Sequence, residues 1–598
     1  MKQFFIFLIL LTFTLAHSQT LSPKQDYFVQ FNGSQLSKKV SIAEVINHSF
    51  LKKYKDGKMN LDINQYADLI KLDQKITVHG NYSDSIPYYQ VTIPIKDKNA
   101  IKNFLIQKNK ENDSLGKPLI EDFGQYSVYN SPDKKTTVAW NDSYLVFFGL
   151  TKKHEYKDYS YPEVEVDSAA TAVTGDPSEV SEVVVETNEV PVVDTAYVDY
   201  SDNYYANFQK EQIAFDSIQA ISQNRFVKLL FENGFTVPAS EKVHENADIS
   251  CWVDYGAAMS SFNTAYAALA RFTTYNKFLL GQNNLGNFVK GINVDFYFDN
   301  DNARVEEIVE YSKPMADIVG KISNRKVNKN IFNYFPSQKP LGYMTYHFNT
   351  KEILNSFPAF STEIFSNPYI LKEDISVATD LISTIIDEEA TATLFDGDIS
   401  VFLYDVVERE VTSKTFEYDE NYESKEVVKT IKKAIPQFSV IFTSTHPTFA
   451  DKLIQLGVRK KGLVQKGNYY EIKGTQEYGN LFIFKDKDVV VVGNNIDAIF
   501  PKDNSFSKEV KKELKQHYIS AKVSLDKLVT AYSNTGEAKE SEIKSFNRLA
   551  QQFTDVTLYS AKKLTDNKLK FELKLNSSKG DKNIILQTLD LVDELSTK

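Results

Sequence analysis

Two aspartates that flank one glycine are the best candidates for acid–base chemistry in this chain of 598 residues. Asp396 and Asp398 stand on either side of Gly397, where an Asp-Gly turn between apolar runs predicts a hairpin. Two neighbouring carboxyl groups can divide the roles of general acid and general base in a hydrolase. The matching region of the first half contains Gly80 and Asn81 instead, so the pair is not repeated.

Trp252 is the best candidate for binding without catalysis. It belongs to the alternating run Ile249–Asp254 and lies on the strand face opposite Cys251. An exposed Trp in an exported protein can stack on a sugar ring or anchor a partner protein, whereas covering helices would make it part of the core. Cys251 shares its face with Ile249 and Val253, which predicts a small buried residue rather than a reactive thiol.

No other residues have the spacing of a known catalytic or metal site. The sequence contains no His-Glu-x-x-His pattern, nucleophile elbow, phosphate loop or dinucleotide fingerprint. The single cysteine excludes a disulfide framework and a Cys-based zinc site. Asp299-Asn300-Asp301 begins like a calcium loop, but Ala303 and Arg304 replace the required oxygen ligand and glycine, which favours a simple turn. We predict no catalytic residue, no cofactor and no metal.

The elements that carry these residues recur along the chain. Residues 26–150 resemble residues 341–495, and residues 245–323 resemble residues 515–598. Two unlike segments that recur in the same order predict a tandem duplication, which we write A-B-A′-B′. Each unit opens with a strand that runs into a helix, and the residues at these four junctions are of the types that cap helices: Asn32, Asp254, Asn349 and Ser524.

Hairpins and helices fill the rest of each unit. Residues 75–93 predict a hairpin in A, and Ala390–Leu394 with Ile399–Tyr404 predict its counterpart in A′. In B, Gly291–Phe298 has the period of a strand, and Asn302–Ile322 is predicted to be helical. The fold class is therefore predicted to be α+β, with antiparallel sheets that carry helices on one face.

Composition divides the chain further. Residues 1–18 combine a basic start, a short apolar run and small residues before a cleavage point after Ser18, which is typical of a secretory signal peptide. Residues 158–209 hold twelve acidic residues and no Lys or Arg, which predicts a disordered linker. The predicted α+β units are 19–157 (A), 210–325 (B), 326–500 (A′, with a charged insertion near 405–432) and 501–598 (B′).

The acidity of the chain belongs to this linker. The formal net charge is −10, and the linker with its twelve uncompensated acids accounts for all of it. An acidic balance therefore says nothing about the folded units. The export signal and the lack of a basic cluster argue against a nucleic-acid partner.

The order of motifs resembles that of large exported proteins of unknown function from the Gram-negative envelope. In that group a strand–helix opening precedes a hairpin of the kind found at Gly397–Leu403, and sheet-and-helix units then repeat. The resemblance implies an envelope location and a repeated α+β fold. It transfers no catalytic residue to this chain.

These observations favour an exported, non-catalytic protein, periplasmic or extracellular, that binds a partner protein or a glycan of the cell envelope. After signal cleavage we expect no membrane span. Two alternatives stay open. One is an envelope hydrolase assembled from distant residues, with Asp396 and Asp398 as its acids. The other is a structural or assembly factor of the cell surface. The weak candidates for a binding site are Trp252, Asp396 and Asp398.

Overall fold

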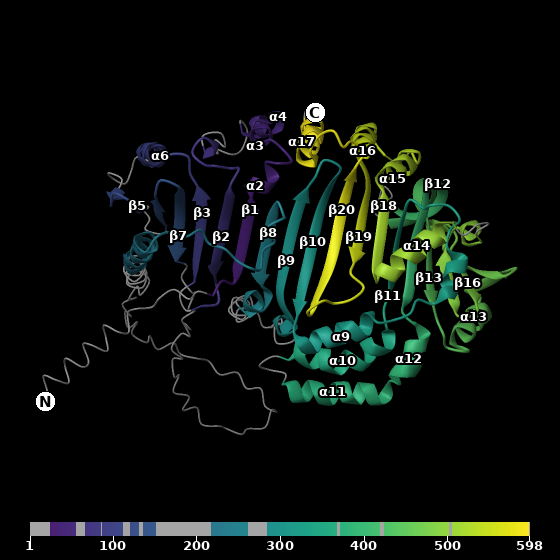
Figure 1. Cartoon of the computed structure of the whole chain (residues 1–598). Helices are drawn as coiled ribbons and strands as arrows, with labels where there is room; N and C mark the ends of the chain where they lie inside the picture. Colours follow the sequence, from purple (N-terminus) through teal and green to yellow (C-terminus); the bar gives the residue numbers. More distant parts are fainter. Residues whose placement is uncertain are drawn as a thin grey trace, which may run out of the picture.

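The computed structural model describes residues 24–55, 66–84, 87–111, 120–130, 136–150, 217–260, 284–366, 371–418, 424–500, 505–536 and 538–596. The predicted signal peptide (1–18) and acidic linker (158–209) lie outside the described residues. The fold class is α+β, as the sequence predicts: a wide antiparallel sheet has helices along both ends of its strands (Figure 1).

The first half contains ten of the described strands. They are β1 (Tyr27–Asn32), β2 (Lys75–Asn81), β3 (Tyr88–Pro94), β4 (Ile120–Asp122), β5 (Ser127–Asn130), β6 (Thr137–Trp140), β7 (Tyr144–Leu150), β8 (Ile249–Asp254), β9 (Val289–Phe298) and β10 (Asn302–Tyr311). The helices are α2 (Gly33–Leu36), α3 (Ile42–Ile46), α4 (Ser49–Lys55), α6 (Lys98–Glu111), a helix over 217–232, a helix that begins at 255 and is described to 260, η1 (Asn284–Asn287) and α9 (Lys313–Ser323).

The second half contains the other ten. They are β11 (Gly342–His347), β12 (Asp398–Tyr418), β13 (Ser424–Thr443), β14 (Leu463–Lys466), β15 (Tyr469–Ile472), β16 (Phe482–Asp486), β17 (Val489–Gly493), β18 (Ile519–Ser524), β19 (Phe553–Ser560) and β20 (Lys568–Ser577). The helices are η2 (Lys329–Tyr334), α10 (Thr350–Phe365), α11 (Lys372–Ile385), α12 (Glu388–Leu394), α13 (Phe449–Arg459), η3 (Gln476–Tyr478), η4 (Ile496–Ile499), α14 (Ser505–Gln516), α15 (Leu525–Ser533), α16 (Glu540–Gln552) and α17 (Ile584–Ser596).

All the described strands form one sheet in which every pairing is antiparallel. The order is β4-β5-β6-β7-β3-β2-β1-β8-β9-β10-β20-β19-β18-β11-β12-β13-β17-β16-β15-β14. Each strand of the first half thus has a counterpart numbered ten higher in the second. The two halves meet at a seam, where β10 pairs with β20. This mirrored order is what a duplication would produce; the duplication itself stays a prediction.

The pairing register is also equivalent in the two halves. Phe31 on β1 lies between Ile76 and Ile249, and Tyr346 on β11 lies between Ile399 and Ile519. In each half the opening strand of A therefore pairs directly with the opening strand of B. The A and B units of each half are continuous within the sheet.

The sequence prediction of a strand at Ala390–Leu394 is wrong. These residues belong to helix α12, which Asp387 caps by accepting a hydrogen bond from the N–H of Ala390 at 2.8 Å. The Ala-Thr alternation is too short to set a strand period, so the cap decides the local structure. The partner of β12 is β13 instead, and the charged insertion lengthens this hairpin out to the pair Tyr418–Ser424.

The predicted helix at Asn302–Ile322 is wrong over its first ten residues. They form β10, where Ala303, Val305 and Val309 follow the period of a strand and pair with both β9 and β20. Helix α9 begins only at Lys313, with Pro314 in its first turn.

Three of the four predicted helix caps are confirmed. Asn32 accepts a hydrogen bond from the N–H of Gln35, and Asn349 accepts one from the N–H of Glu352. Asp254 accepts one from the N–H of Ala257 at 2.9 Å. Ser524 stands at the same position, but its hydroxyl donates to Asp526 instead.

The two faces of the sheet differ in composition. We call the face with Gln30, Ser250 and Asp295 the polar face, and the face with Phe31 and Ile249 the apolar face. Helix α14 and η2 pack on the polar face of the second half, around Tyr343, Phe402 and Ile441. Helix α17 packs on the apolar face, against Phe31 and Phe298. The helices thus divide between the faces, whereas the sequence pattern indicated one covered face.

Candidate functional site

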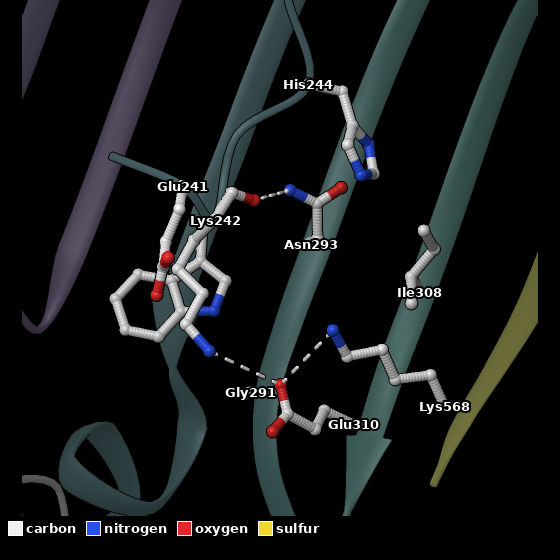
Figure 2. Close-up of a pocket in the computed structure, with 9 residues that line it drawn as sticks. Glu241, Lys242, His244, Gly291, Asn293, Ile308, Glu310 and Lys568 are labelled. Atoms are coloured by element: carbon white, nitrogen blue, oxygen red, sulfur yellow. Dashed lines mark hydrogen bonds and ion pairs between the residues drawn. The ribbon is translucent and has the colours of Figure 1, made fainter. Parts of the chain in front are cut away.

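Trp252 lies beside a hollow on the polar face, close to the seam between the halves. The hollow measures about 110 Å³. Its lining comes from β8, β9, β10, β20 and the loop before β8 (Figure 2): Glu241, Lys242, His244, Trp252, Gly291, Asn293, Ile308, Glu310 and Lys568. Lys568 is the contribution of the second half, because β20 pairs with β10.

Strand register and one glycine place the indole of Trp252. Trp252 lies opposite Asn293, and Gly291 is the next residue of β9 on the same face. A Cβ atom at position 291 would lie 3.0 Å from the indole Nε1. Gly291 therefore leaves room for the edge of the indole beside the hollow, and any larger residue would displace it.

Four charged side chains line the hollow: Glu241, Lys242, Glu310 and Lys568. The ammonium groups of Lys242 and Lys568 lie 3.7 Å and 4.0 Å from Oε2 of Glu310 (Figure 2). Lys242 Nζ also lies 5.7 Å from the centre of the Trp252 ring, which is within range of a cation–π interaction. Each of these charged groups is at least about one-third exposed, so the ion pairs are weak and can yield to a ligand.

Asn293 supplies a hydrogen-bond acceptor without a partner. Its Nδ2 donates to the carbonyl oxygen of Lys242 at 2.8 Å. Its Oδ1 is buried and accepts no hydrogen bond from any described residue. Figure 2 shows this oxygen turned away from Lys242, toward the side where His244 lies. Buried acceptors are normally satisfied, so this oxygen calls for a donor such as a ligand hydroxyl or a water molecule.

His244, Asp295 and Ser250 have the composition of a catalytic triad but not its geometry. The Ser250 hydroxyl donates to Asp295 Oδ1 at 2.5 Å, and the His244 Nδ1 contacts the other oxygen of that carboxylate. In a triad the serine is hydrogen-bonded to the imidazole, which removes its proton. Here Ser250 is fully buried and bound to the carboxylate. The three residues instead hold the loop before β8 against the sheet.

Asp396 and Asp398 lie elsewhere and bind the same arginine. Arg325 donates to the two oxygens of Asp396 at 3.0 Å and 2.6 Å, and to Asp398 at 3.0 Å. Asp398 also accepts a hydrogen bond from the N–H of Asn328 at 2.9 Å. Burial raises the pKa of Asp398, although Arg325 opposes this shift. The pair joins the segment before β11 to the start of β12, and neither residue lines the hollow of Trp252.

Cys251 is less buried than the sequence predicts. It lies with Ile249 and Val253 on the apolar face, as expected, but this face is partly open to solvent. Burial, followed by the charge of Asp295, raises the pKa of its thiol, which disfavours a reactive thiolate.

The hollow contains residues that sequence reasoning missed. The sequence predicts a helix over Glu310, which hides the position of this residue on the strand face of Asn293 and Ile308. Lys568 comes from the far end of the chain, and only the β10–β20 pairing brings it to Trp252. No local signal reveals these two residues: in the run Val305-Glu306-Glu307-Ile308-Val309-Glu310 the apolar residues are three and four positions apart, which is the period of a helix.

Neither a metal centre nor a membrane span is found in the described part of the chain. No three His, Cys, Asp or Glu side chains there are close enough together to hold a metal ion. None of the helices described above combines the length and apolar character needed to cross a bilayer.

No protein-family model and no curated protein matches this chain. Among solved structures, crystal forms I and III of TP0453 are similar over 52% of this chain, at 9% sequence identity. The matches cover 83% and 87% of those chains, with TM-scores of 0.19 and 0.20. Scores this low place no constraint on fold or function.

Proposed function

We propose that this chain is an exported, non-catalytic protein that binds a hydroxyl-rich ligand of the cell envelope, such as a glycan, in the hollow beside Trp252. The signal-peptide pattern at residues 1–18 supports export. The geometry around the hollow favours binding over catalysis: of Ser250, His244 and Asp295 only His244 lines it, and Ser250 is hydrogen-bonded to the carboxylate of Asp295, which does not activate it as a nucleophile.

The observation that carries the proposal is the unpartnered Oδ1 of Asn293 next to an indole and two ammonium groups. Saccharides offer hydroxyl groups that both donate and accept hydrogen bonds, and their C–H faces pack on aromatic rings. Asn293 and Glu310 would accept from such hydroxyls, while Lys242 and Lys568 would donate to them. A purely apolar or strongly anionic ligand would leave part of this set unsatisfied.

The test is titration of the purified protein with soluble peptidoglycan fragments and with lipopolysaccharide-derived oligosaccharides, followed by calorimetry. We expect one of these saccharide classes to bind, and Trp252→Ala to weaken that binding about tenfold or more. Lys568→Ala should weaken it less, because its ion pair is exposed. The matched control is Tyr478→Ala, which removes an exposed aromatic ring from η3, outside the hollow. Equal affinities for the Trp252 and Tyr478 variants, or no binding of either class, would refute the proposal.

A further inference from the structure

Strand β1 buries polar side chains and leaves apolar ones partly exposed. In β1 the buried side chains include Gln30 and Asn32, whereas Tyr27, Val29 and Phe31 are partly exposed. A half-covered sheet normally buries its apolar residues and exposes its polar ones. At β1 the polar face is covered by chain and the apolar face is partly accessible; on β20 no polar-face residue is buried, so both faces are accessible there.

One row of cross-strand neighbours shows this most clearly. It crosses twelve strands of the apolar face from β2 to β17, and its residues are Ile76, Phe31, Ile249, Phe296, Val305, Leu573, Leu558, Ala521, Met344, Val401, Val440 and Val492. All twelve are apolar and none is buried; Leu573 and Met344 are 45% and 40% exposed. At the usual strand spacing this row is about 50 Å long.

Helices border this row on the same face, so that it forms the floor of a trough. On one side α17 packs against Phe31 and Phe298 through Ile585 and Leu589, and α16 and α15 continue the same wall. Figure 1 shows these helices in line along one end of the strands, with α9 to α12 at the other end.

The opposite wall is aromatic. Phe348, just before α10, stacks on Tyr346 of β11 with ring centres 5.5 Å apart. Phe395, just after α12, lies 5.7 Å from Phe348 and 6.0 Å from Phe442 of β13. These rings cover the apolar face at the end of the strands nearest α10 and α12, next to Met344 and Val401.

The walls and the chemistry of the floor select the occupant. A second sheet would pack about 10 Å above the floor, but helices about 10 Å thick already stand there along the margin that α17, α16 and α15 form. Protein interfaces also carry about one hydrogen bond per 100–200 Å². The floor offers none, because its side chains are apolar and its backbone groups are paired within the sheet. A long, narrow hydrocarbon chain needs no hydrogen bonds and follows a twisted strip.

A single charge breaks the apolar surface. In the next row, Glu307 lies between Val294 and Phe571, near the middle of the trough. A carboxylate at this position favours a polar head that is cationic or zwitterionic over one that is anionic.

We propose that this trough binds the hydrocarbon chain of a lipid or other long-chain amphiphile, with the polar head near Glu307. The proposal does not depend on the hollow of Trp252, which lies on the other face of the sheet.

The test is calorimetric titration of the detergent-free protein with hexadecylphosphocholine below its micelle concentration. We expect saturable binding with a negative heat-capacity change, and weaker binding of hexadecanoate, whose head is anionic. Leu573→Glu should weaken hexadecylphosphocholine binding at least tenfold, because it places a charge in the floor. Met344→Glu is the second floor variant, in case the first does not fold as judged by circular dichroism.

The matched control is Leu453→Glu on α13, since Leu453 is 51% exposed and lies outside the trough. It should leave the affinity unchanged. The proposal fails if hexadecylphosphocholine does not bind, or if the floor variants and the control bind it equally well. It also fails if sedimentation shows a dimer that the floor variants dissociate, because a second copy of the chain would then be the occupant.

Discussion

Replacing Arg325 with methionine should lower the free energy of unfolding by about 3 to 5 kcal/mol at pH 7. The guanidinium contacts Asp396 and Asp398 at 2.6 to 3.0 Å, and Asp398 is 1% exposed. Methionine keeps most of the volume but leaves both carboxylates without a cation. The expected cost is that of an uncompensated buried charge, which is why it exceeds the value of an exposed ion pair.

The pH dependence of this loss in the free energy of unfolding is a sharper test than its magnitude at pH 7. Burial raises the pKa of Asp398 above its ordinary value of 3.8, and Arg325 opposes that shift. Without Arg325 the pKa must rise further. A carboxyl group with a raised pKa in the folded state stabilises the fold when protonated, and this contribution is lost as the pH rises through the folded pKa. The deficit of Arg325→Met should therefore shrink as the pH falls from 7 toward 4.

The assay is equilibrium unfolding in urea at several pH values, followed by far-ultraviolet circular dichroism. Circular dichroism reports on the strands of both halves, whereas Trp140 and Trp252 both belong to the first half and report on that half alone. The control is Lys351→Met, which removes an exposed ion pair with Glu389 and should leave the urea midpoint unchanged. A loss below about 1 kcal/mol, or a deficit that grows on acidification, would refute the reasoning.

Two further predictions use the same measurement. Gly397 has φ +106°, and a Cβ there would lie 1.8 Å from the carbonyl oxygen of Phe348, so Gly397→Ala should cost more than about 2 kcal/mol. Gly320→Ala, in the open on α9, should instead stabilise by about 0.5 to 1 kcal/mol, and similar effects at both sites would contradict the geometry. Burial lowers the pKa of His79 and of His347 to about 4. The neutral imidazole of each residue stabilises the fold fully above pH 6.5, and this stabilisation is lost as the pH falls toward 4, by up to about 3 kcal/mol. His79→Gln should therefore make the free energy of unfolding fall less steeply below pH 6.5. Imidazole resonances that titrate near 6.5 in the nuclear magnetic resonance spectrum would disprove this.

Sequence patterns predict several central strands and most of the strand-to-helix junctions of this fold, but they assign β10 to a helix and α12 to a strand. Alternation alone locates β8 and β9, and three junction residues cap helices as expected. The period fails at β10, because its apolar residues are interrupted by Glu306 and Glu307 and then continue into a true helix. Pro314 was the available signal that the helix could not begin before residue 313.

The candidate site was only partly predictable for a different reason. The strand face of Trp252 follows from local alternation, which is a property of neighbouring residues. Its companions Glu310 and Lys568 depend on pairing between distant strands, which no local pattern encodes. Asp396 and Asp398 form a close pair, as their spacing suggests. Their role is decided by Arg325, about 70 residues earlier, which the sequence alone does not connect to them.

The seam between β10 and β20 has a consequence for how the chain matures. β10 is complete at residue 311, but its second partner strand is synthesised only about 260 residues later. Until then the first half presents a ten-residue strand edge with unpaired N–H and C=O groups, which is a template for pairing with other chains. Contacts this distant in sequence also form slowly. A nascent or truncated first half should therefore be the aggregation-prone species of this protein, and the second half acts on it as an intramolecular edge cap.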